Sequence, residues 1–175
     1  MQFGFPMRFA DLDGTLVDVY QENTNMTDEA GQQFPFTVDT LLDNALGPQG
    51  FYGAFGTNVH TDNAAPQADD EAIVASAQAR GVPIISYKQL LDWVDGRNSS
   101  TIRSLHWSAG TLTFVTTVGV GANGLQAMLP VQGPASSLTA ITHGGSPVAY
   151  TVQTIKGVQY AMFDTATGSY QATYS

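Results

Sequence analysis

The sequence has no cysteine and few charged residues. The absence of cysteine excludes disulfides, thiolate zinc sites and cysteine nucleophiles. Charged residues make up 12% of the chain, about half of the usual share, so we expect a surface that is polar but weakly ionic, as is common in secreted proteins. Apolar residues make up 43% of the 175 residues, which favours folded domains over a disordered chain.

Basic residues are scarcer than acidic ones, and long apolar runs are missing. Six Lys and Arg against fifteen Asp and Glu give a net charge of −9, which argues against nucleic acid and against an anionic membrane surface as partners. No run approaches the roughly 20 apolar residues of a membrane-spanning helix. The N-terminal stretch MQFGFPMRFADLDG lacks the pattern of a signal peptide. The composition favours an extracellular location, and if the protein is exported, we expect its export signal to lie outside this chain.

The charges divide the chain into two predicted modules. Residues 1–96 hold fourteen of the fifteen acidic residues but three of the six basic ones. Residues 97–175 hold three basic residues and the acidic Asp164. The change falls beside Gly96-Arg97-Asn98-Ser99-Ser100, a stretch typical of a module boundary.

The first module alternates helices and strands. Apolar residues recur at i, i+3, i+4 and i+7 from Val38, which indicates a helix that Gly47 and Pro48 end. Ser86 and Gln89 form a capping box for the last helix, which Gly96 is expected to end. The patterns predict helices over 37–46, 69–80 and 86–96 and strands over 51–59 and 82–85. This order implies parallel strands with crossover helices.

The second module reads as strand throughout. Apolar residues alternate with polar ones, as in Leu112, Phe114 and Thr116, and glycine-containing turns separate the segments. Seven short antiparallel strands at this spacing predict a β-sandwich. The expected strands cover 102–107, 111–118, 125–131, 138–143, 147–154, 158–163 and 169–174.

Residues 11–18 read Asp-Leu-Asp-Gly-Thr-Leu-Val-Asp, which resembles the first motif of haloacid-dehalogenase-like phosphatases. The resemblance implies that Asp11 is a phosphoryl-accepting nucleophile, that Asp13 protonates the leaving group, and that both hold Mg²⁺. The alternative interpretation is structural. Asp and Gly at these positions are also typical of a turn, after which Thr15–Tyr20 leaves as a strand.

A second resemblance covers residues 36–96. The stretch FYGAFGTNVHTD reads as a strand ending near His60, and a helix and the sequences GVPIIS and YKQLLDWV follow. This order resembles the C-terminal end of polysaccharide-deacetylase-like (β/α) barrels. Residues 17–29 also look like a segment that precedes the late strand in large secreted bacterial proteins of this kind, which often append a β-sandwich. The resemblance therefore implies a partial β/α barrel over 1–96 and a sandwich over 97–175.

This second resemblance directs attention to His60. It implies that His60 is the late histidine that acts as a general acid or orients the acetyl group. Asn58 shares its face of the strand, and Asp62 is placed to orient the imidazole or contact sugar hydroxyls. We expect Asp11 or Asp13 to supply the partner carboxylate. A divalent metal held by Asp11, Asp13 and His60 stays open, since the family's early Asp-Asp and His-x-x-x-His pairs are missing from the sequence.

Three functions stand as hypotheses. The first is the C-terminal part of an extracellular carbohydrate-active hydrolase, of the deacetylase or glycosidase kind, that binds a polysaccharide and has no complete catalytic site by itself. The second is a Mg²⁺-dependent phosphatase that uses Asp11. The third is a non-catalytic module that packs in a larger assembly or self-associates. Glu22, Asp28 and Glu29 are interpreted as solvated loop charges, and Trp93 as a core residue.

Overall fold

The computed structural model describes residues 6–48, 50, 53–62 and 64–175. The chain divides into two units, Met1–Ser86 and Tyr87–Ser175. The sequence analysis predicts the boundary after residue 96, whereas the two units of the structure divide after Ser86. The helix α3 (Tyr87–Ser99) therefore belongs to the second unit. No helix in the described ranges is long and apolar enough to cross a membrane.

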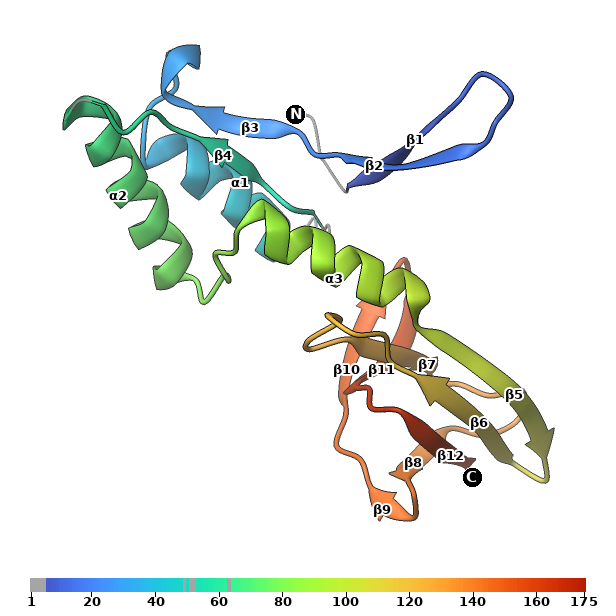
Figure 1. The fold of residues 1–175 in the computed structure, drawn as a ribbon. Helices are drawn as coiled ribbons and strands as arrows, with labels where there is room; N and C mark the ends of the chain where they lie inside the picture. The colour runs from blue at the N-terminus through green and yellow to red at the C-terminus, as the bar shows by residue number, and fades with distance from the viewer. Residues whose placement is uncertain (1–5, 49, 51–52, 63) are drawn as a thin grey trace. The chain divides into compact units, whose positions relative to one another are not determined.

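The first unit begins with an exposed antiparallel hairpin of β1 (Met7–Ala10) and β2 (Leu16–Gln21) (Figure 1). Asp11 and Gly14 close its turn, because Gly14 N donates to Asp11 O at 2.9 Å and Asp11 N donates to Thr15 O at 2.8 Å. Gly14 has a φ of 87°, which favours glycine. The turn interpretation of this segment is therefore confirmed.

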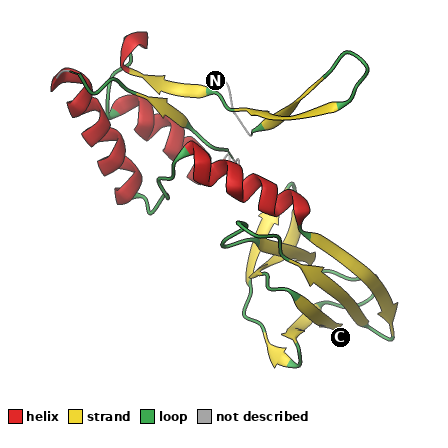
Figure 2. Ribbon diagram, in the orientation of Figure 1, coloured by secondary structure: helices red, strands yellow, loops and turns green. Residues whose placement is uncertain are grey.

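A parallel strand pair follows the hairpin. The strands β3 (Thr24–Thr27) and β4 (Gly56–Asn58) pair in parallel, with Met26 opposite Thr57, and the crossover contains the short 3-10 helix η1 (Asp28–Ala30) and the helix α1 (Phe36–Leu46) (Figure 2). One strand–helix–strand unit of the expected kind is thus present. The described residues form no closed barrel. Phe51 and Tyr52, within the expected strand 51–59, lie outside them.

The core of this unit lies between α1 and α2 (Ala64–Ala79). The predicted apolar stripe of α1 is confirmed, because Val38, Leu41 and Leu42 are buried. Ile73 and Ala77 from α2 and Met26 from β3 complete this core. Helix packing thus fixes α2 against the crossover helix, and through it against the parallel strands.

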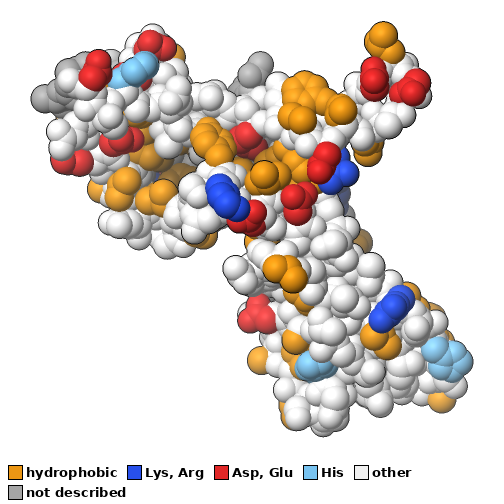
Figure 3. Space-filling model, in the orientation of Figure 1, with side chains coloured by type: hydrophobic (Ala, Val, Ile, Leu, Met, Phe, Trp, Pro, Cys, Tyr) orange, Lys and Arg blue, Asp and Glu red, His pale blue; other side chains and the backbone are white. Residues whose placement is uncertain are grey.

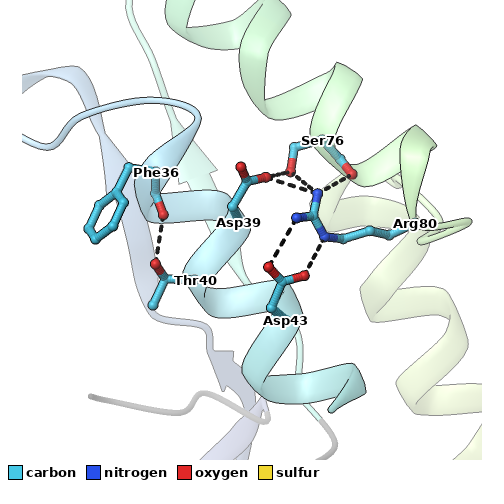
Figure 4. A network of polar contacts seen from close by, with 6 residues as sticks. All are labelled: Phe36, Asp39, Thr40, Asp43, Ser76 and Arg80. Atoms are coloured by element: carbon cyan, nitrogen blue, oxygen red, sulfur yellow. Dashed lines mark hydrogen bonds and ion pairs between the residues drawn. The ribbon is translucent and has the colours of Figure 1, made fainter.

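Arg80, the residue that follows α2, links this helix to α1 through a network of polar contacts (Figure 4). Its Nε and Nη2 donate to the two carboxylate oxygens of Asp43, at 2.7 and 3.2 Å. Its Nη1 lies 2.9 Å from Asp39 Oδ1 and donates to Ser76 Oγ, which in turn donates to Asp39. The hydrogen bond from Arg80 lowers the pKa of Asp43. Such a bidentate pair is directional, so it fixes the rotation of α2 about its own axis as well as its position.

Two predictions in this unit are wrong. The helix α2 begins at Ala64, so the acidic run from Asp69 lies inside the helix and not at its start. Residues 82–85 form no strand, and Ile84 and Ile85 are exposed. An apolar run becomes a buried strand only where a neighbouring strand accepts it, and Pro83 also lacks the backbone N–H that a central strand needs.

The second unit, residues 87–175, is described throughout and contains two antiparallel sheets. Every predicted strand region is confirmed, but the region 147–154 is two strands. The chain leaves one sheet after Pro147 and enters the other at Thr151. The strands of this unit are β5 (Thr101–Ser108), β6 (Thr111–Thr117), β7 (Gln126–Pro130), β8 (Leu138–His143), β9 (Ser146–Pro147), β10 (Thr151–Ile155), β11 (Val158–Asp164) and β12 (Gly168–Tyr174). The five-stranded sheet has the order β5-β6-β12-β8-β9, and the three-stranded sheet has the order β10-β11-β7.

Both sheets contribute to one hydrophobic core. Phe114 and Tyr170 stack in it with ring centroids 5.2 Å apart, and Ile141 comes from the same sheet. From the other sheet, Ala161 and Phe163 are buried against them. The alternation read from the sequence therefore places one face of each sheet in this core.

Helix α3 meets the loop before β7 through glycines. A Cβ on Gly96 would stand 2.5 Å from Val120 O, and one on Gly121 would stand 2.5 Å from Asp92 O. Trp93, which is partly buried, donates from Nε1 to Asn123 O at 3.1 Å. The expectation that Gly96 ends this helix is wrong, since the helix continues to Ser99. Gly96 is needed for close backbone approach and not for chain reversal.

Replacing Gly96 with alanine tests this contact. At an exposed helical position this change stabilises by about 0.5–1 kcal/mol, whereas at Gly96 we expect a destabilisation of about 1–3 kcal/mol because the new methyl group displaces backbone. Urea unfolding followed by tryptophan fluorescence gives the sign, since both tryptophans lie in the second unit. Asn98→Ala, at an exposed position of the same helix, is the matched control and should change the midpoint little. A Gly96→Ala protein as stable as the wild type would contradict the contact.

Candidate functional site

A histidine–carboxylate pair lies at the carboxyl ends of the two parallel strands. Asp28 directly follows β3, and His60 follows β4 by two residues. His60 Nδ1 is 3.1 and 3.2 Å from the two oxygens of Asp28. Parallel strands bring their carboxyl ends to the same edge, and this edge is where α/β proteins place ligands.

Local hydrogen bonds hold the end of β3 in place. The side-chain amide of Gln32 donates to Asn25 O and its oxygen accepts from Thr27 N, both at 2.9 Å. Asn25 Oδ1 accepts from Gly56 N at 3.1 Å, which links β3 to the start of β4. Thr27 begins the 3-10 helix that carries Asp28, because its hydroxyl accepts from the backbone two residues on. The carboxylate is thus positioned by side chains of its own segment.

The two partners differ in exposure. The Asp28 side chain is 12% exposed, while His60 is 51% exposed. The second ring nitrogen of His60, Nε2, lies 3.9 Å from the exposed carboxylate of Glu29. The half-exposed imidazole of His60 thus contacts the nearly buried carboxylate of Asp28 through Nδ1, and its Nε2 is near an exposed side chain.

Each partner shifts the pKa of the other. The hydrogen bond that His60 donates to Asp28, and then the charge of Asp28, raise the pKa of His60 above its ordinary value of 6.5, and the charges of Glu29 and Asp62 add to the shift. Burial alone would raise the pKa of Asp28, but the hydrogen bond and charge of His60 lower it overall. An imidazolium facing a carboxylate is therefore the favoured state up to and beyond pH 6.5.

Chemically, this arrangement suits proton donation. Asp28 orients the ring and stabilises its protonated form, as the carboxylate does in other histidine–carboxylate pairs. Nε2 then carries a proton that a bound leaving group or carbonyl oxygen can receive. Asn58 and Asp62 are both exposed, and the charge of Asp62 contributes to the raised pKa of His60.

Asp11 and Asp13 are not brought to His60. Figure 1 shows their turn at the end of the β1–β2 hairpin that points away from β3. Asp11 Oδ1 accepts from Leu12 N at 2.7 Å and Asp13 Oδ1 accepts from Thr15 N at 2.8 Å. The backbone and hydroxyl hydrogen bonds of Thr15 lower the pKa of Asp13. These carboxylates hold the turn, and the partner of His60 is Asp28 instead.

The interpretation of the loop acids as solvated charges needs correction at two positions. Asp28 is not a solvated loop charge, because its side chain is 12% exposed and pairs with His60; no pattern in the sequence predicts the strand β3 that it follows. Glu22 is not solvated either. Both of its carboxylate oxygens are buried without a hydrogen-bond partner, and burial raises its pKa.

The described residues contain no group of three or more carboxylate or imidazole side chains close enough to hold a metal ion. The three-ligand arrangement of Asp11, Asp13 and His60 is therefore not formed. Comparison of the chain with family models, with curated proteins and with solved structures finds no match. The resemblances to deacetylase-like barrels and to phosphatases gain no support from these comparisons.

Replacing Asp28 with asparagine tests the pair. We expect the pKa of His60, followed by NMR titration of its ring protons, to fall clearly in Asp28→Asn, because the hydrogen-bonding charge is lost. Glu29→Gln is the matched control and should lower it less, since Glu29 acts only through its charge. An equal shift in the two variants would contradict the assigned pair.

The same pair gives the first unit a pH dependence of stability. Because the pKa of folded His60 is raised, its contribution is fully present below about pH 6.5 and is lost as the pH rises through the raised pKa. In a comparison of unfolding midpoints across pH, Asp28→Asn should remove most of the loss of stability that the wild type shows as the pH rises above the ordinary pKa of histidine.

Proposed function

We propose that this chain belongs to an extracellular carbohydrate-active protein of the hydrolase class and that His60, oriented by Asp28, is its general acid. The observation that carries the proposal is the His60–Asp28 pair at the carboxyl ends of β3 and β4. This position is where a deacetylase-like barrel presents its late histidine. Two antiparallel sheets with a shared core follow it along the chain, which supports a β-sandwich module as the second unit.

The surface of the chain agrees with a glycan partner better than with a phosphate. Acidic side chains predominate over the first unit (Figure 3), which holds twelve of the fifteen acids, and such a field repels phosphate esters. The phosphatase alternative needs Asp11 at the end of a buried strand, whereas β1 is exposed along its whole length. Neutral or acetylated sugars carry no charge for this field to repel.

Retention on insoluble glycans tests the proposal. We expect the chain to bind chitin, an N-acetylated polymer, and to bind cellulose, which has a hydroxyl group in place of each acetamido group, less. His60→Ala should weaken chitin retention several-fold, and Asp28→Asn should weaken it less because the ring remains. Asp13→Asn, in the distant turn, is the matched control. Far-UV circular dichroism confirms that each variant is folded. No retention of the wild type, or equal retention of His60→Ala, would overturn the proposal.

The exposed hairpin favours a second candidate function, attachment to another copy of the chain. Met7 pairs with Gln21, and the register shifts between Arg8 and Ala10. Alternation within each strand puts Met7 on one face with Phe9, and Val17 on one face with Val19, and all four side chains are exposed. An isolated two-stranded hairpin is marginally stable in water, so a partner on this face would stabilise it.

Sedimentation velocity over a range of concentrations tests this candidate. We expect wild-type self-association that the double change Phe9→Ser and Val19→Ser weakens at least tenfold. Leu16→Ser, on the other face of the hairpin, is the matched control and should leave association unchanged. A chain that stays monomeric at every concentration would contradict the attachment function.

A further inference from the structure

The two sheets of the second unit differ in width, and the wider one has an uncovered margin at β5. The sheet that contains β5 has five strands, and the opposing sheet has three. Ile102 pairs with the buried Thr116, and Trp107 pairs with Leu112, which packs against the core. Both side chains therefore lie on the core face of their sheet. They are nonetheless 53% and 44% exposed, so the core face of β5 extends beyond the opposing sheet.

The strand β7 is an edge of the three-stranded sheet and pairs with β11 alone. Just after β7, Val131 N donates to Gln159 O at 2.9 Å, and the register of β7 with β11 continues without a shift. Backbone groups alternate in direction along an antiparallel strand, so those of Gln126 and Met128 point away from β11. Residues 87–175 are described throughout and place no other strand there. Pro130, which lacks an N–H group, is typical of such an edge.

A cleft lies between the margin at β5 and the start of β7. It has a volume of about 380 Å³, and its lining includes Ile102 and Thr116 on one side and Leu125 and Ala127 on the other. A strand added to the free edge of β7 would widen the three-stranded sheet over β5 and direct alternate side chains toward Ile102. The second unit therefore has a place for one more strand with an apolar face.

The β1–β2 hairpin has strands of this kind. In β2, which has six residues against five in β7, the exposed Val17 and Val19 share one face. On the other face, Arg8 lies 3.1 Å from Asp18 and donates to the hydroxyl of Tyr20 at 2.9 Å. The polar side chains of the hairpin thus bind one another, and its apolar side chains are the ones that a partner strand or sheet would cover.

Charge also favours the second unit as the partner of the hairpin. Residues 6–21 carry Asp11, Asp13 and Asp18 against Arg8, whereas residues 101–130, from β5 to β7, carry Arg103 and no acidic residue. The hairpin and the margin of the second unit therefore attract each other, while two hairpins repel each other.

We infer that the free edge of β7 receives the β1–β2 hairpin of a second copy of the chain by β-strand addition. This inference rests on the attachment function proposed for the hairpin, and it names the surface that receives it. Backbone groups of Met128 pair with the added strand, and the apolar face of the hairpin covers Ile102. Each copy has one hairpin and one such edge, so the contact is head-to-tail and can repeat from copy to copy.

A charge placed on the receiving surface tests the inference by sedimentation velocity. Ile102→Asp should weaken self-association about tenfold or more, because the docked hairpin would bury an unpaired charge. Val152→Asp is the matched control. Val152 is 50% exposed on the opposite edge strand β10, and it too lies on the core face, since it pairs with the buried Ala161. Its variant should associate like the wild type.

Met128→Pro tests the backbone pairing itself. It removes an N–H group from the free edge of β7 but none from the pairing with β11, so it should weaken self-association while far-UV circular dichroism stays that of a folded protein. Met128→Thr keeps the N–H group and should associate like the wild type. Equal association of the Pro and Thr variants would contradict strand addition.

A mixing experiment identifies the head-to-tail arrangement. Ile102→Asp keeps an intact hairpin, and the double variant Phe9→Ser and Val19→Ser keeps an intact β7 edge. Each should be monomeric alone, and an equimolar mixture should form dimers and nothing larger.

The outcomes separate this inference from the attachment function. If Ile102→Asp associates like the wild type, the hairpin attaches elsewhere, so the inference fails and the attachment function stands. A wild type that is monomeric at every concentration overturns both. A monomeric wild type whose Met128 amide signal shifts when the hairpin is altered would show docking within one chain, which also overturns the inference.

Discussion

The parallel pairing of β3 with β4 is the constraint on which the first unit depends. Parallel strands cannot be joined by a tight turn, so the pairing requires the crossover that α1 provides. Burial of α1 against α2 then holds the crossover, and Arg80 links the two helices through its pairs with Asp39 and Asp43. The pair His60 and Asp28 follows from the same constraint, since it places the residues after both strands at one edge.

The two units differ in how they bury their apolar side chains. In the second unit, two sheets bury a shared core, and α3 meets the loop before β7 through close backbone contacts at Gly96 and Gly121. In the first unit, the α1–α2 core is small and the β1–β2 hairpin keeps its apolar face exposed. The first unit therefore relies more on directional polar contacts, and it is also the unit that holds most of the acidic charge.

The chemistry is divided between the units in the same way. The first unit has a half-exposed imidazole whose pKa is raised by neighbouring carboxylates. The second has a cleft lined by hydroxyl groups, carboxamides, aliphatic side chains and a guanidinium.

The sequence by itself determined the local structure where a pattern is strong. Alternation located every strand region of the second unit, apolar spacing identified the buried stripe from Val38 to Leu42, and Asp-Leu-Asp-Gly was also open to its correct interpretation as a turn. Only the tertiary structure decided which carboxylate meets His60, because Asp28 lies 32 residues away in the chain and spacing carries no signal of that pairing. It also decided that residues 147–154 cross between sheets, and that Gly96 continues its helix. Each of these depends on what packs against a segment, which local pattern does not contain.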